Sequence, residues 1–260
     1  MLRGLVSALR TLTVLSVPGR DAERMSSSLP WFPLAGLLMG LVLYGLAELC
    51  VRITAWPAGT AVVLVAAGII LTRGLHMDGL ADWADGFGGG SDRDRILRIM
   101  KDSHIGSFGV SAVAVGIVAK YACLGRLLET GHLTPIILAY IVSRTAQVDL
   151  MTAQPYARPE GGTAAAFVAT AAFYHLLAAA GGALVLIFAL DGLQWFGPAM
   201  LVTGLIISRF FGFWSRRRIG GITGDVVGAC SELVETAVLF AGVVAGQFTG
   251  ACGLFTDCCL

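Results

Sequence analysis

The feature that most constrains this chain is a series of long stretches with no Asp, Glu, Lys or Arg. A helix of about 20 such residues crosses the ~30 Å hydrocarbon core of a membrane. Only 13% of the residues are charged, against about 25% in a soluble domain. We therefore predict an all-α, polytopic integral membrane bundle of about seven transmembrane helices. Their ranges are 25–47, 53–72, 103–119, 133–153, 161–190, 192–208 and 236–256.

The N-terminal segment differs from these stretches because its leucines recur at helical spacing with arginines between them. Residues 1–16 predict a short interfacial helix, the alternative being a poorly ordered leucine-rich terminus. No period of 20 to 50 residues repeats along the chain, and the predicted spans leave little for a soluble core. We predict a single membrane-embedded domain over residues 1–260.

The basic residues in the loops predict the orientation, because cytoplasmic loops of membrane proteins are enriched in Lys and Arg. With a cytoplasmic N-terminus, that side receives residues 3, 10, 20, 24, 73, 93, 95, 98, 101, 158, 209 and 216–218, and the other side only Arg52, Lys120 and Arg126. The active-site loops are then expected to face the cytoplasm. A net charge of +1 gives no reason to expect a nucleic-acid partner.

The cysteines form no Cys-x-x-Cys pair, so they give little support to a zinc or redox site. Three of them, Cys252, Cys258 and Cys259, cluster in the C-terminal tail. The sequence alone does not decide whether they form a disulfide bond.

The first polar interruption of the apolar pattern is acidic. Asp78, Asp82 and Asp85 are spaced four and three residues apart, which places them within roughly 60° on one helix face. Three carboxylates so close repel one another unless a cation lies among them, and Mg²⁺ prefers carboxylate oxygens. We predict that these three residues bind metal. The alternative is a solvated acidic stripe.

The residues around this triplet add further candidates. Glycines at 86 and 88–90 predict a backbone open to a phosphate, and His76 is a candidate substrate ligand or a structural histidine. Residues 91–101 predict a capped helix, and Lys101 and Asp102 at the entry to the next span are candidate substrate-binding residues.

A second interruption spans residues 155–162 and contains Arg158 and Glu160. The guanidinium of Arg158 suits a phosphate, and Glu160 could orient it, although an ordinary Pro-rich turn is the alternative. Just before this segment, Arg144 and Asp149 lie inside an apolar span. Buried charges need partners, so an ion pair with another helix is as good an interpretation as a substrate contact.

The third interruption spans residues 216–235. Thr223 lies in a Gly-rich turn at the predicted start of the last helix, where free N–H groups can bind an anion. Asp225, Glu232 and Glu235 fall within roughly 80° on one helix face. Carboxylates inside a membrane helix are expensive and indicate function, so we predict that they are catalytic; an ion pair with Arg144 or Arg209 is the alternative.

All three interruptions are predicted on the same side. Together they supply the carboxylates, basic donors and glycines of a Mg²⁺-dependent phosphoryl-transfer site at a membrane surface.

The motifs GLHMDGLADWADGFGGG, IMKDSHIGSFGV, PYARPEG and GGITGDVVGACSELVE closely resemble, in order and spacing, the cobalamin synthase (adenosylcobinamide-GDP ribazoletransferase) family. The likeness extends to WFPLAGLLMG and so covers nearly the whole chain. The chain departs from the family pattern at Arg73, where Gly is usual, and at His104, where Arg is usual.

The resemblance implies a bacterial inner-membrane transferase that joins adenosylcobinamide-GDP to α-ribazole or its 5′-phosphate and releases GMP, with Mg²⁺ as cofactor. We expect Asp78, Asp82 and Asp85 to hold the metal on the diphosphate while the ribazole 5′-hydroxyl attacks. Asp225, Glu232 or Glu235 would accept the proton, or this second cluster would bind another Mg²⁺. Membrane lipid is a further expected partner, and the sequence does not decide between a monomer and a homo-oligomer.

Two alternatives remain at this point. A CDP-alcohol phosphotransferase also has an acidic membrane helix, but Asp85-Gly86 is not followed by the Ala-Arg of that family's motif. A divalent-cation transporter could use Asp149, Glu232 and Glu235 along a path, although it would not need the glycine-rich segments.

Overall fold

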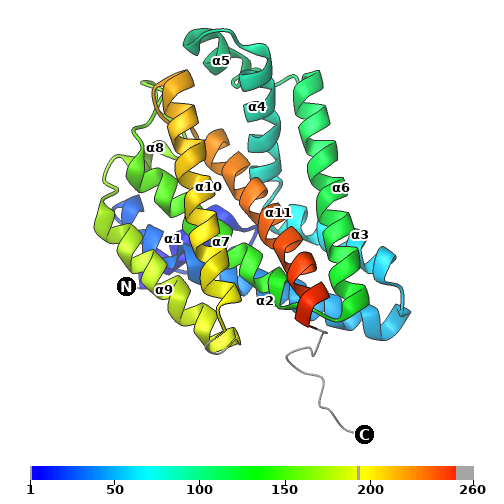
Figure 1. Ribbon diagram of the computed structural model, residues 1–260. Helices are drawn as coiled ribbons and strands as arrows, with labels where there is room; N and C mark the ends of the chain where they lie inside the picture. Colours follow the sequence, from blue (N-terminus) through cyan, green and yellow to red (C-terminus); the bar gives the residue numbers. More distant parts are fainter. Residues whose placement is uncertain (1, 192–193, 250–260) are drawn as a thin grey trace, which may run out of the picture.

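The computed structural model describes residues 2–191 and 194–249, which pack into a bundle of helices without a strand in the described part of the chain (Figure 1). Cys252, Cys258 and Cys259 lie outside the described residues. The helices are α1 (Leu2–Leu12), the 3₁₀ helix η1 (Met25–Trp31), α2 (Phe32–Thr54), α3 (Pro57–Leu71), α4 (Leu75–Gly89), α5 (Arg93–Ile99), α6 (Ser107–Thr130), α7 (Thr134–Ala153), α8 (Ala165–Val168), α9 (Phe173–Asp191), α10 (Phe196–Ile219) and α11 (Gly224–Thr249).

The number of membrane-capable helices agrees with the prediction. Six helical segments of the described chain are long and apolar enough to cross a membrane, and a bent pair, α3 with α4, makes a seventh if it counts as one span. The six are Met25–Thr54, Ser107–Thr130, Thr134–Ala153, Phe173–Leu190, Phe196–Ile219 and Gly224–Gly246. The all-α, multi-pass membrane fold is therefore confirmed.

The bend between α3 and α4 is where the predicted span 53–72 was wrong. Helix α3 has 15 residues, a length of about 22 Å, and α4 leaves it at an angle of 87°. The chain turns through Arg73 and Gly74, whose φ angles are 55° and 69°. A left-handed conformation costs a non-glycine residue about 1–2 kcal/mol, which explains why a glycine would suit position 73.

Helix α1 confirms the helix predicted at the N-terminus and is tied to this bend. The backbone N–H of Val14 donates to the carbonyl oxygen of Leu71 at 2.7 Å. The guanidinium of Arg73 donates to the carbonyl oxygen of Arg10 at 2.9 Å. The face of α1 that includes Ala8 and Leu12 is buried. Helix α1 thus holds the start of the acidic helix α4 in place.

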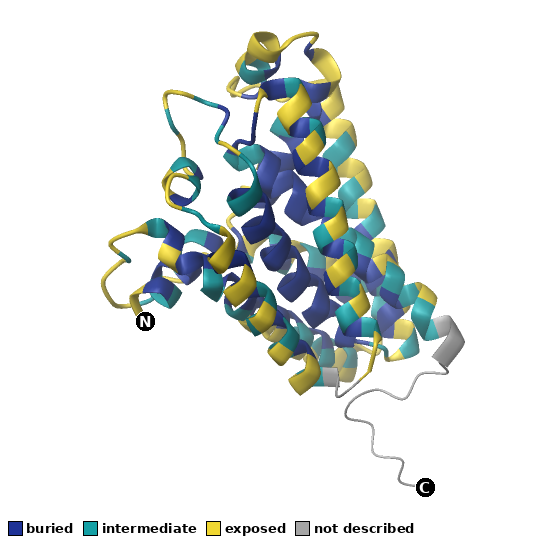
Figure 2. Cartoon of the chain, turned by 60° about the vertical axis from the view of Figure 1, so that its left-hand side comes forward, coloured by how far each residue is buried: buried dark blue, intermediate teal, exposed yellow. Residues whose placement is uncertain are grey.

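Helix α7 is the centre of the bundle. Of its apolar window, 89% is buried inside the protein, against 22% for α6 and 33% for α10. Helices α2, α9, α10 and α11 pack around it, and Figure 2 shows buried residues along the interior with exposed residues on the outer faces. Exposed apolar side chains such as Val115, Ile206 and Phe240 cover those outer faces. Lipid can therefore surround the outer faces of the bundle, whereas α7 is surrounded by other helices.

Two boundaries differ from the prediction in ways that affect the site. Helix α11 begins at Gly224, which agrees with the helix start predicted beside Thr223, and it extends the charge-free window 236–256 toward the N-terminus, so Asp225, Glu232 and Glu235 all belong to it. Helix α6 continues to Thr130, and Lys120 lies inside the bundle, 9% exposed, rather than in a loop on the far side. These helices extend through charged residues because the charged side chains form ion pairs with buried partners, as described below.

The glycine run after the acidic triplet was expected as an open loop and is instead helical. Helix α4 continues to Gly89. A side chain added at Gly86 would collide with Met100, and one at Gly88 with Phe108. These glycines allow α4 to pack closely against α5 and α6. The following helix agrees with the prediction: α5 is capped by the side chain of Asp92, which accepts from the Arg95 N–H at 3.0 Å.

Candidate active site

The three polar interruptions meet at one end of the bundle. The backbone of the second lies against that of the third, where Ala157 N–H donates to the carbonyl oxygen of Ile222 at 2.8 Å. The guanidinium of Arg93, at the start of α5, donates to the carbonyl oxygens of Ile219 at 3.0 Å and Ala157 at 2.8 Å. Figure 1 shows α5, the upper end of α4 and the α10–α11 connection at this end. The predicted clustering of the three segments is therefore confirmed.

The aspartates of α4 differ in their surroundings although they share a helix face. Asp78 is exposed, Asp82 is half-buried and Asp85 is 8% exposed. The charges that act on Asp82 are those of Asp225, Asp78, Arg158 and Asp85. Three negative neighbours and one positive neighbour leave this region with an excess of negative charge.

Asp85 has a structural function that the sequence did not reveal. Its two carboxylate oxygens accept the backbone N–H groups of Gly106 at 2.7 Å and Gly109 at 2.8 Å, at the start of α6. These are N–H groups that a helix cannot satisfy internally. The metal role predicted for Asp85 stays a prediction, but both of its oxygens already have partners.

Asp225 joins the acidic cluster from the other side, at the first turn of α11. Its Oδ2 accepts from Arg158 at 2.9 Å and from the hydroxyl of Thr223 at 3.2 Å. Arg158 and Asp225 are 15% and 21% exposed, respectively. Arg158 also donates to the carbonyl oxygen of Met100 at 3.3 Å. The structure thus brings together the predicted residues Asp78, Asp82, Asp225, Arg158 and Thr223.

This cluster has the donor atoms that a hard divalent cation requires. Within the described residues, Asp78 and Asp82 form no ion pair, and the guanidinium of Arg158 beside the cluster is engaged with Asp225. Oxygen ligands from one or two carboxylates, with room for water and phosphate, are typical of Mg²⁺ sites. The carboxylates present fit a Mg²⁺ ion.

Two hollows of different size have Asp78 in their lining. A small cavity of about 100 Å³ is lined by Asp78, Asp225, His76, Gln147, two threonines and apolar residues. An open groove of about 510 Å³ is lined by Asp78, Arg73, Ile105 and further residues of α4 and α6. Asp78 lines both hollows, so ligands of two different sizes could meet at its carboxylate.

His76 lines this cavity and is buried, 2% exposed. Its Nε2 lies 2.9 Å from the amide nitrogen of Gln147 on α7. Because an amide nitrogen only donates, Nε2 is the acceptor and the proton of the neutral ring is on Nδ1. His76 thus orients Gln147, a residue that the sequence analysis did not single out.

Glu232 and Glu235 are not brought to the aspartate cluster. Helical rise places them about 10 and 15 Å along α11 from Asp225. Lys120 donates to Glu232 Oε2 at 2.6 Å and to Glu235 Oε2 at 2.7 Å, and Arg144 donates to Glu235 Oε1 at 2.8 Å. We call these four residues the buried charge cluster. Its two cations balance its two anions.

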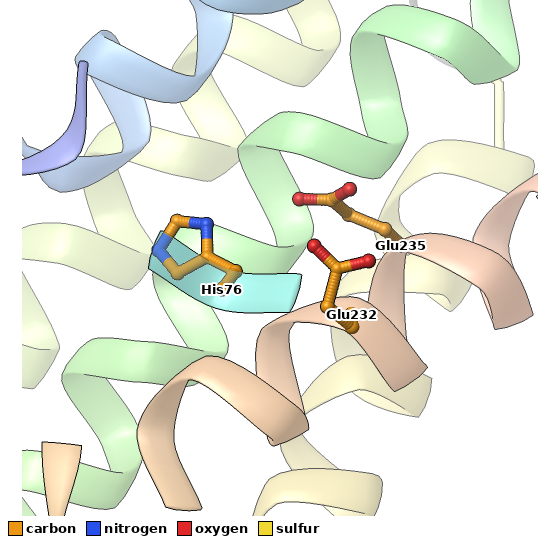
Figure 3. Close-up of side chains that lie close together, drawn as sticks. All are labelled: His76, Glu232 and Glu235. Carbon is orange, nitrogen blue, oxygen red and sulfur yellow. The ribbon is translucent and has the colours of Figure 1, made fainter. Parts of the chain in front are cut away.

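Figure 3 shows His76 and the two glutamates converging from α4 and α11, with one ring nitrogen toward Glu235. Their nitrogen and oxygen atoms lie within 4.8 Å of one another, as in a metal site. The ammonium of Lys120 already occupies the position between the two carboxylates. These contacts form a charge-neutral cluster between helices, and the catalytic role predicted for the two glutamates stays a prediction.

The two charges predicted inside α7 are paired with other helices. Arg144 contacts Glu235 and the hydroxyl of Ser231 on α11. Asp149 contacts Arg209 on α10 at 2.6 Å. Of the two interpretations left open by the sequence, ion pairs between helices agree with the structure.

The remaining predicted residues lie at the exposed rim. Lys101 and Glu160 form an ion pair at 3.5 Å, with side chains 67% and 54% exposed. The carboxylate of Asp102 accepts a hydrogen bond from the backbone N–H of His104 at 3.0 Å, and the ring Nδ1 of His104 lies 2.7 Å from the same oxygen. These hydrogen bonds lower the pKa of Asp102 below its usual value. Arg158 of the cluster donates to the carbonyl oxygen of Met100, the residue before Lys101, and the binding role predicted for the rim residues stays a prediction.

Comparison with known proteins gives a single result over nearly the whole chain. A family model described as cobalamin-5-phosphate synthase matches residues 4–243. A relative from Chlorobaculum parvum, named adenosylcobinamide-GDP ribazoletransferase, is 53% identical over 94% of this chain and 96% of its own length. Relatives of the same name from Chlorobaculum tepidum and Syntrophobacter fumaroxidans are 52% and 38% identical over 92% and 90% of this chain, and 94% and 96% of theirs. No solved structure matches.

Proposed function

The chain belongs to the cobalamin-5-phosphate synthase family, and we propose that it joins adenosylcobinamide-GDP to α-ribazole or α-ribazole 5′-phosphate, with release of GMP. It is a transferase of cobalamin biosynthesis that acts in assembly of the nucleotide loop. The observation that carries the proposal is the position of Asp78, beside other carboxylates and in the lining of both a small cavity and a wide groove. Such a place suits a reaction between a small acceptor and a large activated donor.

The proposed reaction is a phosphoryl transfer. A ribose hydroxyl of the acceptor forms a bond to the phosphorus that bears the cobinamide, and the bond from that phosphorus to the GMP oxygen breaks. The hydroxyl proton passes to a carboxylate. An acceptor that carries a 5′-phosphate has no free 5′-hydroxyl. We therefore propose that one of the other ribose hydroxyls attacks, instead of the 5′-hydroxyl expected from the sequence.

Asp78 and Asp82 are the residues that would hold Mg²⁺, with Asp85 fixing the start of α6 beside them. When bound, the ion would neutralise the diphosphate and orient it. Arg158 would bind an equatorial phosphate oxygen with its planar donor fork. Each of these residues acts on charge or position, which is how phosphoryl transfer is catalysed in general.

Among the three carboxylates predicted as proton acceptors, we assign the proton to Asp225. It lines the small cavity together with Asp78, where the acceptor would enter. Glu232 and Glu235 are held by Lys120 and Arg144 instead. Those two glutamates would keep α11 in register against α6 and α7.

Purified protein with adenosylcobinamide-GDP, α-ribazole and Mg²⁺ tests the proposal directly. We expect GMP and the cobalamin product in equal amounts, and none after the metal is chelated. Absence of GMP from intact, folded protein would overturn the assignment. Cation flux into proteoliposomes without nucleotide would instead favour the transporter alternative.

The described helices make this a multi-pass membrane protein, and we propose that it lies in a bacterial inner membrane with the aspartate end in the cytoplasm. The support is the excess of Lys and Arg in the loops at that end. Membrane lipid then covers the exposed apolar faces. Labelling of D94C and R126C in a cysteine-free variant tests the orientation. An impermeant reagent added to cells with only the outer membrane permeabilised should reach the second position and not the first.

A further inference from the structure

We infer that the small cavity beside Asp78 and Asp225 binds the flat heterocyclic base of the acceptor nucleoside, with Gln147 as its hydrogen-bonding partner. This inference rests on the proposed function, since it assigns one substrate of that reaction to one part of the site. It goes further because it divides the site into an acceptor side and a donor side. Three features of the cavity support this assignment: its size, the apolar side chains in its lining and the unused polar atoms of Gln147.

The cavity has the size of a pocket for one edge of an aromatic ring system. Its volume is about 100 Å³, less than the ~150 Å³ of an apolar cavity that holds a benzene molecule, so the rest of a bicyclic base would lie in its opening. A corrin ring is far larger than this and could contact the wide groove only. Its apolar side chains include Leu12, Phe32, Met151, Phe167 and Val227, and its polar lining includes Thr11, His76 and Thr163 in addition to Asp78, Asp225 and Gln147. A flat base with an apolar edge is complementary to such walls.

Gln147 is a buried polar group of this cavity that can bind a ring nitrogen. It is 1% exposed, lines the cavity, and its Oε1 has no hydrogen-bond partner. Its Nε2 contacts His76 at 2.9 Å, which uses one of two amide protons. A buried amide with unused donor and acceptor capacity is costly unless a ligand satisfies it. The second proton is therefore available to a ring nitrogen that accepts.

The benzimidazole base of a ribazole matches this arrangement. It is flat, and once attached to ribose it retains one unsubstituted ring nitrogen, which is an acceptor. The unused donor of Gln147 and the apolar side chains of the lining therefore match the acceptor base.

The position of the cavity also fits the direction of the reaction. Asp78 and Asp225 line the cavity, so a ribose attached to a base bound there would lie beside the proposed proton acceptor. The groove that Asp78 also lines is left for the activated donor. The attacking and leaving oxygens would then approach the phosphorus from opposite sides.

A pair of ligands tests the hydrogen bond without depending on catalysis. α-Ribazole and the corresponding indole riboside differ by one ring atom, because a C–H replaces the accepting nitrogen. We expect calorimetry in the absence of donor to show about tenfold tighter binding of α-ribazole by the wild-type protein. In the Gln147→Leu variant the two ligands should bind with equal affinity. An undiminished preference in Gln147→Leu would overturn the inference.

A cavity-filling substitution tests the location through steady-state kinetics. Val227 lines this cavity, and we expect Val227→Phe to raise the KM for α-ribazole at least tenfold while the KM for adenosylcobinamide-GDP stays within twofold. The matched control is Val65→Phe, which makes the same change beside a different cavity, lined by Lys120 and Glu232. A rise in the donor KM alone would instead assign the cavity to the donor.

The outcomes separate this inference from the proposed function. If wild-type protein forms GMP and cobalamin but both cavity variants keep the wild-type affinity for α-ribazole, the inference is wrong and the function stands. If wild-type protein forms no GMP yet binds α-ribazole through Gln147, the base site stands and the reaction is wrong. Should Val227→Phe fail to fold, the ligand pair with Gln147→Leu decides the question.

Discussion

Gly79 of α4 lies directly against the backbone of Asp225 of α11. A methyl group on Gly79 would stand 2.9 Å from the carbonyl oxygen and 3.1 Å from the Cα of Asp225. This close approach brings two aspartate-bearing helices together, and a backbone cannot move aside as a flexible side chain can. The separation of α4 and α11 is therefore set by the absence of a side chain at residue 79.

We expect Gly79→Ala to force α4 and α11 apart, with a loss of about 1–3 kcal/mol in the free energy of unfolding and at least a tenfold loss of kcat. Thermal unfolding in detergent and GMP release measure the two effects. Gly45→Ala is the matched control, because no atom lies within 4 Å of the added methyl and alanine is the better helix former by about 0.5–1 kcal/mol. Equal behaviour of the two variants would contradict the close contact.

Asp82→Asn is expected to reduce kcat on the order of 10²-fold, the scale seen when one stabilising group is removed from a transition state. Asp82 is half-buried among carboxylates and Arg158, so loss of one negative charge should leave the fold intact and weaken metal binding. Initial rates over a range of Mg²⁺ concentrations measure both effects. Asp94→Asn changes an exposed carboxylate on α5 and should be neutral. An Asp82→Asn enzyme with wild-type kinetics would exclude the metal assignment.

Asp85→Ala should act mainly on stability, because it leaves the N–H groups of Gly106 and Gly109 without their acceptor. Loss of such a cap costs about 1–2 kcal/mol, and the midpoint of thermal unfolding reports it. Asp85→Asn keeps one acceptor oxygen and is expected to lose about half as much. If Asp85→Ala unfolds at the wild-type temperature, the capping role is wrong.

Lys120→Met removes one of two cations from the buried charge cluster and leaves Glu232 and Glu235 with Arg144 alone. Breaking a buried pair in this way costs about 3–5 kcal/mol. The double variant Lys120→Met with Glu232→Gln restores neutrality and should recover most of that loss in unfolding experiments. Lys101→Met, at an exposed ion pair of 3.5 Å, is the control and should change little. A double variant no more stable than Lys120→Met would contradict a role based on charge balance.

The distribution of charged residues predicted much of this fold because it reports directly on the membrane. Windows without charge located the spans, and the polar interruptions between them located Asp78, Asp82, Arg158 and Asp225 at one end. The spacing of the aspartates was informative because a helix converts sequence distance into direction. Each of these predictions depends on one helix at a time. They agree with the structure where all the residues concerned lie on a single helix.

What the sequence could not reveal depends on contacts between helices. Glu232 and Glu235 lie on one helix face whether their partner is a metal or a lysine, and only the packing of α6 against α11 brings Lys120 to them. Gln147 gave no signal because a neutral amide does not interrupt an apolar window. From the sequence alone, the glycines of α4 are equally consistent with a loop and with a tight helix contact. In the structure, Met100 and Phe108 pack against them, so they form the contact.

The central position of α7 has a consequence for how the protein is made. Arg144 and Asp149 reduce the tendency of this helix to leave the insertion machinery for lipid, since each such charge at mid-membrane costs about 2.5–3.5 kcal/mol. Their partners, Glu235 and Arg209, belong to α11 and α10 and are synthesised later. Stable integration of α7 must therefore wait for the C-terminal helices, so a ribosome that stops before α10 would leave a nascent chain with an unneutralised helix and a natural target for membrane quality control.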